Sequence, residues 1–176
     1  LQMTQAEIAV PIPEIDTVIT FYYDQLSQLI RFDRFRQDES VQEWSDLLGP
    51  DVIGLTHADV TATITQMFVS INRDNGVILT ADEEALLMIT PWVHDWGEIK
   101  IEGYGVGDIT FDQKSTADAR VEHEIFERIV RDLPDVSTRE YIKLAYEVAM
   151  ARDTKLGRMF NAIERIGYLE TAMRAY

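Results

Sequence analysis

The chain of 176 residues contains no cysteine, so it has neither a disulfide framework nor a thiolate that binds a metal or attacks a substrate. It also lacks any run of the roughly 20 uninterrupted apolar residues that a membrane-spanning helix requires. The first residues show no basic start followed by an apolar run, which is the pattern of a secretory signal. These absences predict a soluble, cytoplasmic protein with no membrane partner.

Basic residues are scarce. The chain has 16 lysines and arginines against 31 aspartates and glutamates, which gives a formal net charge of −15 at pH 7. Because such a surface repels a phosphate backbone, we expect no binding to duplex DNA or RNA. A small phosphorylated ligand is not excluded, since a metal ion and a few arginines reverse the potential locally.

Segments that alternate between apolar and polar residues are short, so the sequence offers no good candidate for a sheet. Helical spacing of apolar residues is present instead, and no internal repeat is visible. The stretches with this spacing include 14–30, 57–71, 115–132 and the segment from Thr138 to the C-terminus. We therefore expect one all-α domain over residues 1–176, a compact bundle of six or seven helices, with 1–13 as an irregular N-terminal arm.

A further helix is predicted to begin after Thr80, because Thr80 and Glu83 have the spacing of a capping box. We expect it to be kinked at Pro91 and to carry His94 and Asp95 near its C-terminal end. Three glycines between residues 103 and 107 predict that the segment after it is a loop.

Four polar residues interrupt the apolar pattern of the predicted helices: His57, His94, Asp95 and Asp153. A buried carboxylate without a partner is costly, and a divalent cation would satisfy two imidazoles and two carboxylates that converge in a helical core. Mixed nitrogen and oxygen ligands suit Mn, Co, Fe, Ni or Zn, and suit Mg less well. Taken singly, each residue has an alternative role, since a histidine at a helix start is often a cap and an aspartate in a long helix is usually solvated.

The order of these residues resembles that of the HD-domain metal-dependent phosphohydrolases, in which a histidine is followed by a His-Asp pair and then by a distant aspartate. The resemblance covers roughly residues 20–170 and is nearest to the small 5′-deoxynucleotidases. The segments that carry it are LSQLIRFDRF (26–35), HADVTATITQMF (57–68), HDWGEI (94–99), GDI (107–109) and EVAMARDTKLGRMFNAI (147–163).

The resemblance implies a role for several further residues. Glu98 would orient a water or a group next to the metal ligands, and Asp108 on the glycine-rich loop would protonate the leaving group. Arg34 would contact the phosphate, and Phe35 would lie near the sugar. Because the loop differs in length from the family pattern, Glu102 is the alternative to Asp108 as the loop acid.

The resemblance also implies the activity. The expected function is removal of phosphate from (deoxy)nucleoside 5′-monophosphates by a metal-activated water, and a homodimer is the expected assembly. A second interpretation is a triphosphohydrolase that releases triphosphate from a deoxynucleoside triphosphate. A third is an HD module without catalysis that binds a ligand or another protein.

Overall fold

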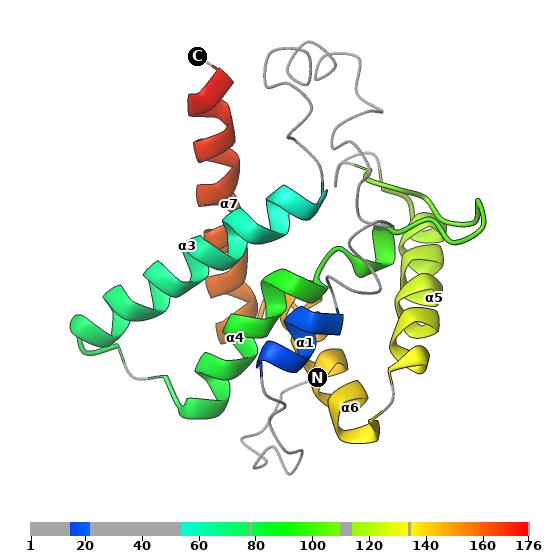
Figure 1. The fold of residues 1–176 in the computed structure, drawn as a ribbon. Helices are drawn as coiled ribbons and strands as arrows, with labels where there is room; N and C mark the ends of the chain where they lie inside the picture. Colours follow the sequence, from blue (N-terminus) through cyan, green and yellow to red (C-terminus); the bar gives the residue numbers. More distant parts are fainter. Residues whose placement is uncertain (1–14, 22–53, 78, 110–113, 134, 176) are drawn as a thin grey trace.

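The computed structural model describes residues 15–21, 54–77, 79–109, 114–133 and 135–175 of the chain (Figure 1). The elements in these ranges are α1 (Ile15–Phe21), α3 (Gly54–Asp74), α4 (Ala81–Val93), the short 3-10 helix η2 (Trp96–Glu98), α5 (Thr116–Asp132), α6 (Val136–Met150) and α7 (Lys155–Ala175). No strand occurs within the described ranges, so the predicted all-α class is confirmed. None of the described helices is both long enough and apolar enough to cross a membrane. The arm predicted over 1–13 lies outside the described residues.

Helix α4 is the centre of the bundle, and it packs against α1, α3, α6 and α7 (Figure 1). Its apolar side chains explain this position, because Leu86, Leu87, Ile89 and Val93 are all buried to 1% exposure or less. Full burial of one such side chain stabilises a fold by about 1.5–3 kcal/mol. The residues that follow α4 are therefore held in the interior of the molecule.

The predicted start of α4 is confirmed. The Thr80 hydroxyl accepts a hydrogen bond from the Glu83 N–H at 3.2 Å, and the Glu83 carboxylate accepts one from the Thr80 N–H at 2.9 Å. The helix ends at Val93, before the two residues that it was predicted to carry, so that His94 is its C-cap and Asp95 follows it. Pro91 lies in the last turn and is buried.

The segment from Thr138 to the C-terminus, whose apolar spacing is helical, forms two helices, α6 and α7, because the chain turns between Met150 and Lys155. Thr154 causes the break: its hydroxyl accepts a hydrogen bond from the Gly157 N–H at 3.0 Å, as an N-terminal cap does. A side chain at position 157 would collide with the Ala151 carbonyl oxygen, so glycine is required there.

An aromatic cluster fixes η2 beneath the end of α4. Trp96 is buried to 1% exposure, with its ring centroid 5.7 Å from that of Phe21 and 6.4 Å from that of Phe126. Phe126 in turn stacks on Tyr146 of α6. Trp96 is thus a core residue, and its burial anchors the two nearby acidic residues, Asp95 directly before η2 and Glu98 at its end.

Candidate metal centre

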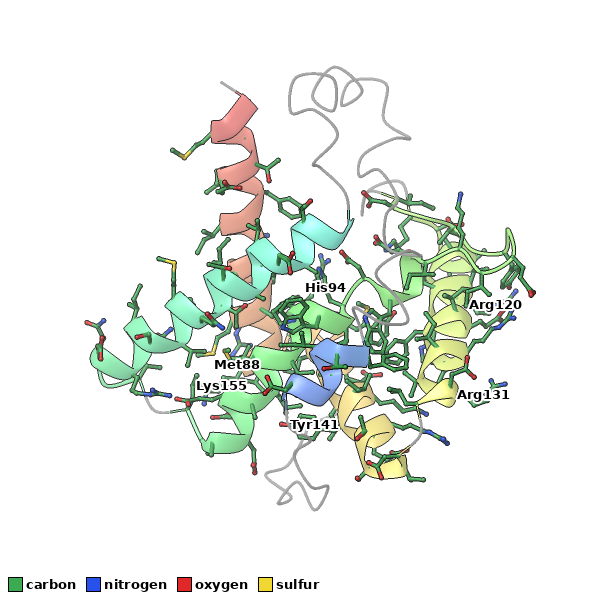
Figure 2. The ribbon with its side chains drawn as sticks, in the orientation of Figure 1. Met88, His94, Arg120, Arg131, Tyr141 and Lys155 are labelled. Carbon is green, nitrogen blue, oxygen red and sulfur yellow. The ribbon has the colours of Figure 1, made fainter. Side chains whose placement is uncertain are left out.

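Three elements that are far apart in the sequence bring ligand-type side chains together in the interior. His57 comes from the first turns of α3, His94 from the end of α4 and Glu164 from the middle of α7. One nitrogen or oxygen atom of each lies within 4.8 Å of the corresponding atoms of the other two. Figure 2 shows His94 inside the molecule at the point where α4 ends.

Asp95 belongs to the same cluster. The His94 Nε2 atom lies 3.2 Å from His57 Nε2, 3.2 Å from an Asp95 oxygen and 3.7 Å from a Glu164 oxygen. The second Asp95 oxygen lies 3.9 Å from His57 Nε2. Two nitrogens bound about 2.1 Å from one ion, roughly 90–109° apart, lie roughly 3.0–3.4 Å from each other. The distance between the Nε2 atoms of the two imidazoles therefore fits two neighbouring ligands of one metal ion.

The hydrogen bond at the other side of the His94 ring sets its protonation pattern. His94 Nδ1 lies 2.8 Å from the Pro91 carbonyl oxygen, and a carbonyl oxygen accepts but never donates. Nδ1 must therefore carry the proton, and in the neutral ring Nε2 presents a lone pair to His57, Asp95 and Glu164. A backbone carbonyl that orients one imidazole nitrogen while the other faces the ion is typical of metal-binding histidines.

Helix α7 contributes three residues to the site at intervals of four. The Phe160 ring meets His94 edge-on with centroids 5.3 Å apart, and the Tyr168 ring stacks on His57 at 6.1 Å. Glu164 lies between them on the same helical face. Sequence reasoning missed Glu164, although a carboxylate in register with Phe160 and directly after the buried Ile163 was a signal of its position.

A cavity of about 270 Å³ opens beside these residues. Its wall consists of His94, Asp95, Gly97, Glu98, Asp108, Ile109, Lys114, Glu122, Tyr146, Ala149, Met150, Arg152, Glu164 and Tyr168. Five of these residues carry a carboxylate, whereas the lysine and the arginine carry the fixed positive charges. The excess of negative charge favours binding of a cation.

The predicted catalytic residues Glu98 and Asp108 both line this cavity. The Glu98 side chain is 12% exposed, and one of its oxygens lies 3.7 Å from Lys114 Nζ. The alternative loop acid, Glu102, is 83% exposed and lies 3.5 Å from Arg128, away from the cavity wall. The predicted phosphate and sugar contacts, Arg34 and Phe35, lie outside the described residues.

Asp153 occupies a different environment from the one predicted. It lies in the connection between α6 and α7, its side chain is exposed, and its backbone carbonyl accepts a hydrogen bond from Arg158. The position inside a helix that we predicted for it is therefore wrong, because the cap at Thr154 ends the helical pattern. Among the described residues, the carboxylate grouped with both histidines is Glu164. The ligand role of Asp153 stays a prediction.

Comparison of the chain with family models, with curated proteins and with solved structures gives no match.

Proposed function

We propose that this protein is a metal-dependent phosphohydrolase that removes phosphate from (deoxy)nucleoside 5′-monophosphates. The observation that carries the proposal is the orientation of His94. Its Nδ1 donates a hydrogen bond to a backbone carbonyl, while its Nε2 faces the His57 imidazole and two carboxylates. Such an arrangement provides lone pairs that converge on one point, as a divalent cation requires.

The side chains present fit such an ion. His57, His94 and Glu164 would hold it, and Asp95 is close enough to take part. Two nitrogen donors with carboxylate oxygens suit Mn, Co, Fe, Ni or Zn better than Mg. The cation would also offset part of the negative charge of the cavity, which otherwise disfavours binding of a phosphate dianion.

When bound, such an ion would supply Lewis acidity, which lowers the pKa of a water and polarises a phosphoryl oxygen. Glu98 on the cavity wall accepts a proton from the attacking water, whose oxygen forms the new bond to phosphorus. The ester P–O bond then breaks, and Asp108 in its acid form donates a proton to the leaving 5′-oxygen. Phosphoryl transfer of this kind relies on positioning and charge, so it needs no covalent nucleophile.

The cavity also offers a surface for the organic part of the substrate. Ile109, Ala149, Met150 and the aromatic ring of Tyr168 make up the apolar section of its wall. Apolar walls with a few convergent polar groups are typical of small-molecule sites. A nucleoside attached to the phosphate would contact this section, and the resemblance to 5′-deoxynucleotidases supports a nucleotide in particular.

Two measurements on the full chain test the proposal. Elemental analysis of protein purified without chelator should find close to one divalent metal per chain. The metal-loaded protein, incubated with a panel of nucleoside mono- and triphosphates, should release inorganic phosphate from the monophosphates. Release of triphosphate from a deoxynucleoside triphosphate, or no product from any nucleotide, would replace this function by one of the two alternatives.

A further inference from the structure

Lys114 lies next to the candidate metal centre in an environment that is unusual for a lysine. Its Nζ atom donates a hydrogen bond to Glu122 at 2.9 Å and lies 2.7 Å from the second oxygen of that carboxylate. An oxygen of Glu98 lies 3.7 Å away. The side chains of Lys114 and Glu122 are 23% and 7% exposed, so this ion pair is largely removed from water.

The position of the pair is set by a close approach of two elements. A side chain on Gly97 would lie 2.8 Å from the Glu122 carbonyl oxygen, which is closer than real Cβ contacts. Gly97 thus allows η2 to pack directly on α5. As a result, Glu98 and Glu122 both lie near the same ammonium group.

The ammonium group retains its charge and has donors to offer. Burial acts to lower the pKa of Lys114, but the hydrogen bond with Glu122 and the nearby carboxylates outweigh it and raise the pKa. An ammonium group carries three N–H donors. Among the described residues its hydrogen-bonding acceptor is Glu122, because the 3.7 Å to Glu98 exceeds a hydrogen-bond distance.

The N–H donors of Lys114 lie beside the cavity. Lys114, Glu98 and Glu122 line the same space as His94 and Asp95. A buried ion pair is often no more stabilising than a well-packed apolar pair. Stability alone therefore does not account for this pair, and its place in the wall of a cavity suggests that it binds a ligand. A phosphate group that enters this space would meet both the carboxylates of the metal centre and the ammonium group of Lys114.

We propose that Lys114 binds a phosphoryl oxygen of the ligand, with Glu122 as the residue that holds the ammonium group in place. The inference rests on the proposed function, because the phosphate that Lys114 would bind is that of the proposed substrate. Lys114 would be a second positive charge beside the metal. The chemical class that it requires is a phosphate monoester or free phosphate, whose oxygens accept charge-assisted hydrogen bonds.

Calorimetric titration of inorganic phosphate into the metal-loaded chain tests the inference, with metal content measured in each sample. Lys114→Met removes the charge and keeps the chain length, and it should weaken phosphate binding about tenfold or more while the metal stays bound. Lys143→Met is the matched control, because Lys143 also pairs with an α5 carboxylate, Glu127 at 2.9 Å, but lies outside the cavity wall. Equal losses in both variants would overturn the inference.

A double variant addresses the case in which Lys114→Met does not fold because Glu122 is left buried without its partner. Lys114→Met combined with Glu122→Met replaces the ion pair by apolar side chains and should restore folding. Phosphate binding should still be at least about tenfold weaker than in the wild type. If the double variant binds phosphate as tightly as the wild type, Lys114 serves only to neutralise Glu122, and the inference is wrong.

The two proposals fail in different ways. Wild-type protein that contains no metal but loses phosphate binding through Lys114→Met would contradict the proposed function and support the phosphate site. Wild-type protein that holds metal and hydrolyses monophosphates, with unchanged phosphate binding in both Lys114 variants, would contradict the phosphate site alone. Wild-type protein that holds metal but binds no phosphate would contradict the phosphate site.

Discussion

The two ends of helix α4 carry ionisable groups in opposite settings. At the N-terminal end, Lys155 Nζ lies 2.8 Å from an oxygen of Glu83, and Arg73 lies 2.6 Å from Glu84. Both basic side chains are well exposed, at 47% for Lys155 and 67% for Arg73. Glu83 and Glu84 therefore each have beside them an opposite charge that is in contact with water.

At the C-terminal end, the groups are buried and carboxylates predominate. The His94 side chain is 4% exposed, and those of Asp95 and Glu164 are 12% and 14% exposed. The two carboxylates approach the same His94 nitrogen from different elements. Burial of charge in this way costs free energy unless a cation compensates it.

The contrast separates charges that we expect to serve the fold from charges that we expect to serve binding. The N-terminal groups stabilise the start of the helix and are solvated, so their replacement should affect stability alone. The C-terminal groups reduce stability in the absence of a cation, which is typical of a functional site. Mutations at the two ends should therefore separate activity and metal binding from folding.

The largest effect is expected at the proposed catalytic carboxylates beyond the C-terminal end. Glu98→Gln and Asp108→Asn keep the size of each side chain and remove its charge. Each should lower turnover by about 100-fold or more, the usual contribution of a general acid or base, while metal content stays unchanged. Steady-state kinetics with a deoxynucleoside monophosphate, together with elemental analysis, measures both quantities.

Glu102→Gln is the control for the loop residue, because Glu102 is exposed and lies away from the cavity wall. It should retain full activity. An inactive Glu102→Gln beside an active Asp108→Asn would show that Glu102 is the loop acid.

A somewhat smaller effect is expected on metal affinity. Loss of residues that merely orient metal ligands lowers affinity about 10–100-fold, so loss of a ligand should cost at least as much. We expect His94→Ala and Glu164→Gln to lose most of the metal at low micromolar concentrations of added ion. Asp153→Asn should keep it, because Asp153 is exposed in the α6–α7 connection. Metal titrations of the three variants give the comparison, and the reverse ranking of Glu164 and Asp153 would restore the ligand set predicted from the sequence.

Local patterns predicted much of the fold from the sequence. The all-α class, the span of α5 and the capping box at Thr80 all depend on residues that are close together in the chain, and each is confirmed. The pairing of His94 with Asp95 beside a helix end was visible for the same reason. Apart from the expected convergence of His57 with His94 and Asp95, features that depend on contacts between distant segments were not visible.

Glu164 and the α6–α7 break show the physical cause of the misses. Apolar spacing continues through residues 151–154, and the break follows from the Thr154 cap and from the close approach that Gly157 allows. Glu164 was missed because its environment is set by packing of α7 on α3, which spacing within α7 does not encode. The ion pair of Lys114 with Glu122 was not visible for the same reason, since Glu122 is eight positions away and Gly97 brings η2 close to α5.

At the N-terminal end of α4, a moderate effect on stability is expected from loss of the cap. Thr80→Ala removes the hydroxyl that accepts the Glu83 N–H, and it should destabilise the fold by about 1 kcal/mol. For a chain of this size, that corresponds to a fall of about 2–4 °C in the melting temperature. Thermal unfolding measures the fall, and metal titration should give an unchanged affinity. A lower metal affinity would show that the two ends of the helix are coupled.

The smallest effect is expected for the exposed pair between Glu83 and Lys155. Burial acts to raise the pKa of Glu83, but the hydrogen bonds from Lys155 and from the Thr80 N–H outweigh it, so the pKa in the folded protein lies below the ordinary 4.5. A carboxyl group with a lowered pKa stabilises the fold fully above its unfolded pKa. That contribution is lost as the pH falls through the folded pKa.

A double-mutant cycle with Glu83→Gln and Lys155→Gln isolates this pair from the other carboxylates that titrate in the same range. Because both side chains are partly exposed, the coupling free energy at pH 7 should be about 0.2–1 kcal/mol. It should shrink as the pH falls below 4.5 towards 3, since protonated Glu83 no longer attracts the ammonium group. Urea unfolding at pH 7 and at about pH 3 gives the coupling free energy at each pH. A coupling that stays constant between them would show that hydrogen bonding to the neutral acid, and not charge, holds Lys155 at this end of the helix.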